Sequence, residues 1–171
     1  MAAKGTAEKM VEVALAEEGY VEGPKDNETK YGAFTKANFL PWCGSFVMWC
    51  ANESGVKIPN TVSTMAGAAA FKKLGTWTDA AVAKPEPGDI VYFDFMEGGA
   101  PIEHVGIVVK DNGDGTVTTI EGNTQGPKKG KGSQANGGEA VKKIRAYKKN
   151  AAKLPIFIED RKSTRLNSSH I

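Results

Sequence analysis

The hydrophobic pattern of this chain changes period near residue 85, and this change restricts the fold more than any other feature. Before it, apolar residues recur at helical spacing. After it, beginning with the Pro-Gly turn of KPEPGDIVYFDF, the segments are typical of strands. Helices followed by an antiparallel meander define an α+β architecture. We therefore expect N-terminal helices packed on a C-terminal antiparallel β-sheet, in a single domain of residues 1–159.

Three helices are expected in the first half of the chain. The first covers Ala7–Glu18, the second starts at Trp42 or Cys43 and runs to about Ser54, and the third covers Val62–Lys73. A glycine follows each of them, as is common at helix ends. The segment between the first two, residues 19–41, is rich in Gly, Asn and Pro and is expected to be a loop.

Four strands are expected in the second half: Ile90–Phe95, His104–Lys110, Thr116–Glu121 and a last one in EAVKKIRAY, with alternating exposed bases. DNGDG between the second and third is a hairpin turn signal. Lys128–Gly138, rich in Gly and Lys, is expected to be a flexible surface loop.

The C-terminal segment DRKSTRLNSSHI, residues 160–171, resembles the translation of a sequencing-adapter oligonucleotide. We expect it to be non-native, the alternative being a natural disordered tail, and exclude it from the fold. Its exclusion leaves His104 as the one histidine with a bearing on function. On this reading we expect that the natural gene continued further, into another domain.

Charge and hydropathy exclude some partners. A net charge of +2 on 171 residues is too small to indicate nucleic-acid binding, and no run is apolar enough to span a membrane. The N-terminal segment is amphipathic and acidic, unlike a signal peptide, so we expect synthesis in a cytoplasm. We also expect a monomer.

Both cysteines of the chain lie in PWCGSFVMWC. On one helix, Cys43 and Cys50 would be separated by a rise of about 10.5 Å, whereas a disulfide needs Cα atoms within about 7 Å. Cys50 is expected to be a buried core residue. Cys43, at the helix start, is placed where free N–H groups and the macrodipole stabilise a thiolate and an oxyanion. A second core cysteine is the alternative for Cys43.

A cysteine nucleophile needs a base, and the base needs an orienting group. His104 opens a predicted strand, and Glu121 and Asn123 close the next one. If these strands pair through the hairpin, both polar residues lie near His104. On a continuing strand they share a face, so either could accept a hydrogen bond from the imidazole. The alternative for both is a strand end that runs into a turn.

With these residues in this order, the sequence resembles a CHAP domain, the cysteine- and histidine-dependent amidohydrolase/peptidase family of the papain-like superfamily. The matching motifs are KYGAF, PWCGSFVMWC, PGDIVYFDF, HVGIVV and IEGN. They look most like the version found in bacteriophage endolysins. The resemblance implies a papain-like CHAP fold, Cys43 as nucleophile, His104 as general base, Glu121 as its orienting group and Asn123 as a fourth polar member.

The resemblance also implies an activity, the cleavage of an amide in peptidoglycan through a cysteine acyl-enzyme. The enzyme would act on the cell wall after release from the host cytoplasm, as an N-acetylmuramoyl-L-alanine amidase or a crossbridge endopeptidase. Two alternatives remain: a non-catalytic wall-binding module or phage tail component with this fold, and an NlpC-type peptidase. NlpC-type enzymes usually complete the triad with another histidine, so Glu121 argues against them.

Three further expectations concern the surroundings of the site. Tyr31 or Asn38 is a candidate second oxyanion donor, beside the backbone N–H of Cys43. No metal or cofactor is expected, although some CHAP domains bind calcium before the nucleophile. The matching segment here is DNETKY, where Lys30 is a poor neighbour for a cation. The basic residues from Lys128 to Lys149 are either a solvated face or a surface attracted to anionic wall polymers.

Overall fold

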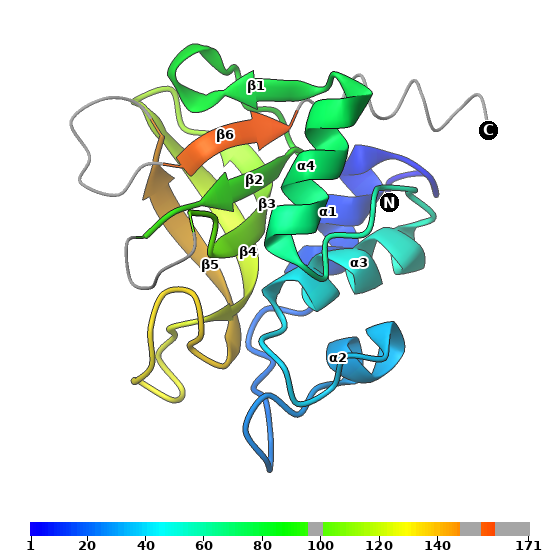
Figure 1. Ribbon diagram of the computed structural model, residues 1–171, viewed down its shortest axis with the longest axis vertical. Helices are drawn as coiled ribbons and strands as arrows, with labels where there is room; N and C mark the ends of the chain where they lie inside the picture. Colours follow the sequence, from blue (N-terminus) through cyan, green and yellow to red (C-terminus); the bar gives the residue numbers. More distant parts are fainter. Residues whose placement is uncertain (96–100, 148–154, 160–171) are drawn as a thin grey trace.

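The computed structural model describes residues 1–95, 101–147 and 155–159, and shows helices packed against one face of a twisted sheet (Figure 1). The helices are α1 (Ala7–Leu15), α2 (Lys30–Thr35), α3 (Cys43–Ser54) and α4 (Thr64–Leu74), with a 3-10 helix, η1, at Ala80–Val82. The strands are β1 (Trp77–Asp79), β2 (Ile90–Phe93), β3 (His104–Asp111), β4 (Thr116–Thr124), β5 (Glu139–Ala146) and β6 (Pro155–Glu159). The predicted α+β class is confirmed.

All described strands belong to one sheet, in the order β1-β6-β2-β3-β4-β5, and each neighbouring pair is antiparallel. The meander from β2 to β5 matches the predicted strands in order. The last strand does not continue that meander, because β6 returns to lie between β1 and β2 (Figure 1).

The helix predictions hold for α3 and nearly so for α4, while α1 ends at Leu15, before the expected Glu18. The loop predicted over residues 19–41 is wrong in part, because it contains α2. Thr29 caps this short helix, with its hydroxyl accepting a hydrogen bond of 2.8 Å from the N–H of Gly32. Six residues without an apolar stripe give no helical period to detect.

The sheet separates two apolar clusters. Side chains of β2, β3 and β4 that face the helices pack with α1, α3 and α4, for example Tyr92, Ile107 and Ile120. Their neighbours on the other face form a smaller cluster, which includes Phe93 and Phe95. No helix among the described residues is long and apolar enough to cross a membrane.

The contact between α3 and β4 is close because β4 carries a glycine there. A β-carbon added at Gly122 would lie 2.5 Å from Cβ of Phe46 on α3, a distance that packed atoms do not adopt. The absence of a side chain at Gly122 therefore lets the first turns of α3 lie directly on the end of β4, next to Glu121.

Candidate active site

Cys43 is the first residue of α3, as predicted, and its side chain is 5% exposed. Trp42 occupies the N-cap position without making a side-chain cap hydrogen bond. The backbone N–H groups of the first turn are thus left uncapped by a side chain, beside the sulfur. A helix start of this kind favours negative charge on the thiolate and on an oxyanion.

Both cysteines are free, so the exclusion of a disulfide is confirmed. Cys50 is fully buried in the cluster that joins α3 to the helix-facing side of the sheet. Burial raises the pKa of the Cys50 thiol well above its ordinary value, with the Glu17 carboxylate adding to the effect. Cys50 is therefore a neutral core residue, distinct from Cys43.

The start of α3 is fixed by aromatic packing. The Trp42 ring stacks on Tyr31, with centroids 5.3 Å apart and planes 18° apart. Its indole N–H donates a hydrogen bond of 3.0 Å to Oε1 of Glu22. The segment between α1 and α3 therefore holds the residue before Cys43 through both stacking and hydrogen bonding.

His104 is the first residue of β3, as predicted, and its side chain is fully buried. Its Nε2 lies 2.8 Å from Oε1 of Glu121. Its Nδ1 has no hydrogen-bond partner among the described residues, and the Cys43 side chain is near enough to the ring to raise the pKa of the imidazole. The imidazole thus lies between the sulfur and the carboxylate.

The charge state of His104 follows from these neighbours. Burial by itself would lower the pKa of the imidazole, but interactions with Cys43 and with the Glu121 carboxylate outweigh burial. Together they raise the pKa of His104 to about 9, so that the ring carries its proton at neutral pH.

The Glu121 side chain reaches His104 by passing over Gly106, a glycine of the neighbouring strand β3. The pairing of Ile107 with Ile120 brings Gly106 beside Glu121 on the neighbouring strand. A β-carbon added at Gly106 would lie 2.7 Å from Cγ of Glu121. Because Gly106 lacks that carbon, the Glu121 side chain can lie over β3 and meet His104, two residues away on the same face.

Arg145 is a member of this cluster that the sequence reasoning missed. Its Nε donates to Oε2 of Glu121 over 2.9 Å and its Nη2 to Oε1 over 2.6 Å. The prediction of alternating exposed bases on β5 is therefore wrong at this position, because the Arg145 side chain is only 12% exposed. Ile144, the residue before it, is 72% exposed. The hydropathy of this strand indicates the opposite orientation.

The carboxylate of Glu121 has a further donor, the hydroxyl of Thr119, 2.5 Å from Oε2. Burial would raise the pKa of Glu121. Arg145 and His104 outweigh burial and hold the pKa of Glu121 well below its usual range. The carboxylate is therefore ionised and accepts hydrogen bonds on both oxygens.

Asn123 is also buried, but its side chain serves a different segment. Its Nδ2 donates to Oδ1 of Asn136 over 3.0 Å, and its Oδ1 accepts from the N–H of Gly138 over 3.0 Å. The backbone at Asn123 is left-handed, with φ of 59°, and the pairing of β4 with β5 shifts register there. The strand continues to Thr124 as expected, but its pairing is irregular after Glu121, so Glu121 bonds the imidazole while the Asn123 amide bonds the following loop. Asn123 ties the loop of residues 125–138 to the end of β4.

The two candidate oxyanion donors, Tyr31 and Asn38, differ in the hydrogen bonds that they already make. The Tyr31 hydroxyl donates a hydrogen bond of 2.8 Å to Glu17 within the core, so this expectation is wrong for Tyr31. Asn38 accepts two backbone N–H groups through its Oδ1, those of Thr29 and Phe39. These contacts of Asn38 shape the segment before Cys43 and leave its role in an oxyanion site a prediction.

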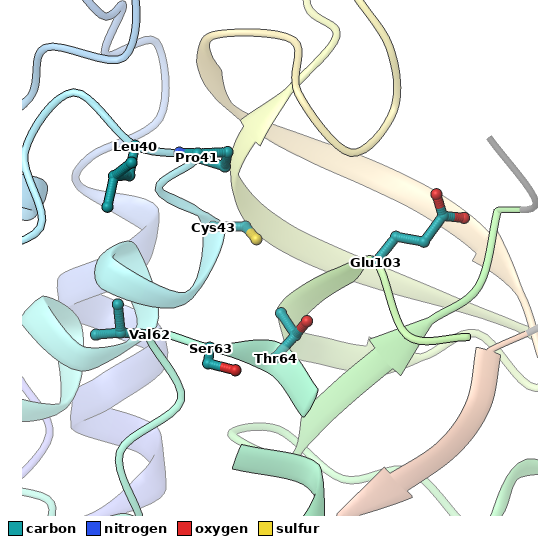
Figure 2. Close-up of a pocket in the computed structure, with 7 residues that line it drawn as sticks. All are labelled: Leu40, Pro41, Cys43, Val62, Ser63, Thr64 and Glu103. Carbon is teal, nitrogen blue, oxygen red and sulfur yellow. The ribbon is translucent and has the colours of Figure 1, made fainter. Parts of the chain in front are cut away.

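A pocket of about 390 Å³ opens beside Cys43 (Figure 2). It is lined by Leu40, Pro41, Cys43, Val62, Ser63, Thr64 and Glu103. The sulfur points into it from one wall, and Glu103 lies across it on the segment that leads into β3 (Figure 2). The Thr64 hydroxyl donates to the carbonyl of Ile102 over 3.0 Å, which joins the start of α4 to that segment.

Oxygen atoms of Glu22 and Asn27, before the nucleophile, bear on the expected absence of calcium, which stays a prediction. The Glu22 carboxylate is occupied by the N–H groups of Asn27 and Trp42, and the Lys129 ammonium lies 3.4 Å from its Oε2. The buried Oδ1 of Asn27 has no partner among the described residues. Within the same residues, no three His, Cys, Asp or Glu side chains gather as metal ligands do.

Several basic residues from Lys128 onward form hydrogen bonds or ion pairs with other parts of the chain. Lys128 donates to the carbonyl of Gly19 over 2.6 Å, Lys129 pairs with Glu22, and Arg145 with Glu121. Lys148 and Lys149 lie outside the described residues. These contacts favour a structural role for much of the segment over a free basic surface.

The model of the CHAP domain family matches residues 35–123, which are 89 of the 171 residues. This protein belongs to the CHAP domain family. No curated protein matches the chain. CHAP domains are typically cysteine- and histidine-dependent amidohydrolases or peptidases, and membership implies peptidoglycan as the substrate class. The matched span runs from just before Cys43 to Asn123.

Proposed function

We propose that this protein is a peptidoglycan hydrolase of the phage endolysin type that cleaves an amide bond through an acyl-enzyme on Cys43. The observation that carries the proposal is the placement of His104 between the Cys43 thiol and the Glu121 carboxylate, at the N-terminus of α3. A nucleophile, a proton carrier and an orienting anion in contact are the parts that acyl transfer needs.

In the first half of the reaction, the Cys43 thiolate attacks the amide carbonyl carbon and forms a C–S bond. The negative charge moves to the carbonyl oxygen, where N–H groups at the start of α3 stabilise it. His104, in its protonated form, gives its proton to the departing amine as the C–N bond breaks. The products are a thioester on Cys43 and a free amine.

In the second half, the neutral His104 takes a proton from a water molecule, and the resulting hydroxide attacks the thioester carbon. The C–S bond breaks and a carboxylic acid leaves, which gives its remaining proton to the solvent, and the thiolate and the protonated imidazole are regenerated. Glu121 holds the ring through Nε2 in both halves, so that Nδ1 stays directed at the sulfur. Asn123 contributes by holding the loop of residues 125–138 at the end of the same strand.

A non-catalytic wall-binding module or tail component is the main competing function. Binding alone does not need a buried imidazole with a raised pKa next to a thiol, and these groups are costly to bury. The NlpC-type alternative is disfavoured because Glu121 occupies the orienting position.

Clearing of a peptidoglycan suspension tests the proposal. The wild-type chain should lower the turbidity, and Cys43→Ala should not, while Cys50→Ala serves as a matched control for loss of a thiol. If the wild-type chain clears no wall type, or if Cys43→Ala clears as fast as wild type, the hydrolase proposal is wrong.

The bond cut is decided by the fragments. Mass spectrometry of products from defined peptidoglycans separates a lactyl-amide cut, which frees an intact stem peptide, from a crossbridge cut, which leaves the stem on the glycan. We expect one of these two product sets.

A further inference from the structure

We propose that Arg145 is a positioning residue of the active site, acting on His104 through Glu121. This inference rests on the proposed function for its role in catalysis. Arg145 is far from the nucleophile in sequence and lies outside the matched family span of residues 35–123.

The geometry of the contact supports this role. The guanidinium meets the Glu121 carboxylate through two hydrogen bonds, one to each oxygen, which fixes the plane of the carboxylate. Oε1 is shared between Nη2 of Arg145 and Nε2 of His104, at 2.6 Å and 2.8 Å. The orientation of the imidazole is therefore set by a carboxylate that Arg145 itself holds.

Arg145 is held from its other sides as well. Its Nη1 donates to Gln134 over 2.8 Å and its Nη2 to the Thr124 hydroxyl over 3.2 Å. Its guanidinium carbon lies 4.6 Å from the centroid of the Phe95 ring. The Phe95 ring also lies 5.5 Å from the His104 ring, so the same aromatic wall covers both groups.

Only a long side chain can make this contact. Arg145 pairs with Val117 in the sheet, whereas Glu121 pairs with Val141, so the two Cα positions are four residues apart along the strands. The Arg145 and Glu121 side chains together span that separation. Lysine has a single donor group in place of the fork, and therefore cannot hold both oxygens in one plane.

The groups that act on the Glu121 charge come from three elements. His104 lies on β3 and interacts with Cys43 of α3. Arg145 and Lys143 lie on β5. Beside the protonated imidazole of His104, the cation that donates to the carboxylate is Arg145. Without it, burial should shift Glu121 toward the neutral acid at mildly acidic pH, and the imidazole should lose its orienting anion.

Kinetics on a soluble peptidoglycan fragment test this role. Arg145→Met should lower kcat/KM by about tenfold to a hundredfold, the range of a charge-assisted hydrogen bond, and move the acid limb of the pH profile to higher pH. Arg145→Lys should give a smaller shift. Lys142→Met, which removes an exposed charge from the same strand, should behave as wild type.

Two outcomes separate positioning from a merely structural role. In the Glu121→Gln background, Arg145→Met should cost little further activity, because the group it acts through is already lost. An equal loss in both backgrounds, or an unchanged acid limb in a folded Arg145→Met, overturns the proposal. If Arg145→Met does not fold, Arg145→Lys carries the same comparison.

A second readout does not depend on activity. The chain has two histidines, so the ring signals of His104 can be followed by NMR with His170→Asn as assignment control. In wild type they should stay flat from about pH 4 to 6, and in Arg145→Met they should show an inflection as Glu121 is protonated. The double variant of Arg145→Met and Glu121→Gln should lack this inflection. If the His104 ring signals of Arg145→Met show no inflection between about pH 4 and 6, the inference is overturned. A wild-type chain without hydrolase activity overturns the proposed function instead.

Discussion

His104 donates from Nε2 to Oε1 of Glu121 over 2.8 Å, with both side chains fully buried. This contact commits one ring nitrogen to the carboxylate and leaves Nδ1 for the Cys43 side. The two halves of the site come from different layers, Cys43 from the helices and the His104–Glu121 pair from the sheet.

The two cysteines should respond oppositely to substitution. Cys43→Ser should abolish wall clearing while leaving thermal unfolding within the range of ordinary surface changes. Cys50→Ser should keep activity at low temperature but lower the free energy of unfolding by about 1–3 kcal/mol, because a hydroxyl replaces a thiol in a fully buried position. Circular dichroism melts and turbidity assays check both. Equal effects of the two changes would contradict the separation of roles.

The raised pKa of His104 predicts a loss of activity in alkali. The imidazole carries its proton up to about pH 9, and the leaving amine needs that proton. We therefore expect the rate to fall as the pH rises through about 9. A rate that keeps rising beyond that pH would contradict this charge state.

The same group should make folding stability depend on pH. The pKa of His104 in the folded chain, about 9, lies above its ordinary value of 6.5, so its contribution to stability is complete below about pH 6.5. That contribution, of the order of 3 kcal/mol, should be lost as the pH rises through about 9. Urea unfolding across this window measures it, and His104→Gln should show a flatter profile.

Gly106→Ala should impair catalysis without adding or removing a polar group. The new β-carbon would lie 2.7 Å from Cγ of Glu121 and push the carboxylate away from His104. A displacement of about 1 Å at a catalytic group costs about a hundredfold in rate, and we expect a loss of that order in kcat/KM. In the Glu121→Gln background the same change should cost much less. Equal losses in the two backgrounds would point to a general disturbance of β3.

Tyr31→Phe should leave kcat/KM unchanged, because the hydroxyl is bonded to Glu17 inside the core. The lost hydrogen bond should lower the free energy of unfolding by about 1 kcal/mol. A tenfold drop in rate with an unchanged melting temperature would restore Tyr31 as an oxyanion donor.

The parts of the site that the sequence predicts are those with local signals. Cys43 comes two residues after Pro41 at a helix start, His104 opens a strand, and the turn of DNGDG brings Glu121 back toward His104. Each signal extends over a few residues. The short turn pairs the two strands, although an irregularity between Val108 and Lys110 shifts their register by one residue before it reaches the site.

Arg145 has no such signal. Its place beside Glu121 depends on the register between β4 and β5, which is set by the loop of residues 125–138 and by the irregularity after Glu121. The left-handed backbone at Asn123 in that irregularity also redirects the Asn123 side chain to the loop. The sequence also does not predict which strands pair with β6, because β1 and β2 lie far from it in sequence.

The position of β6 has a consequence for the order of events during synthesis. Among the described strands, β1 pairs with β6 alone, and β6 in turn covers the outer edge of β2. The helices and the β2–β5 meander leave the ribosome first, with the β2 edge still open to other chains. Since residues 155–159 emerge after the meander, that edge stays open until they appear, and a nascent chain stalled before them would be prone to aggregate.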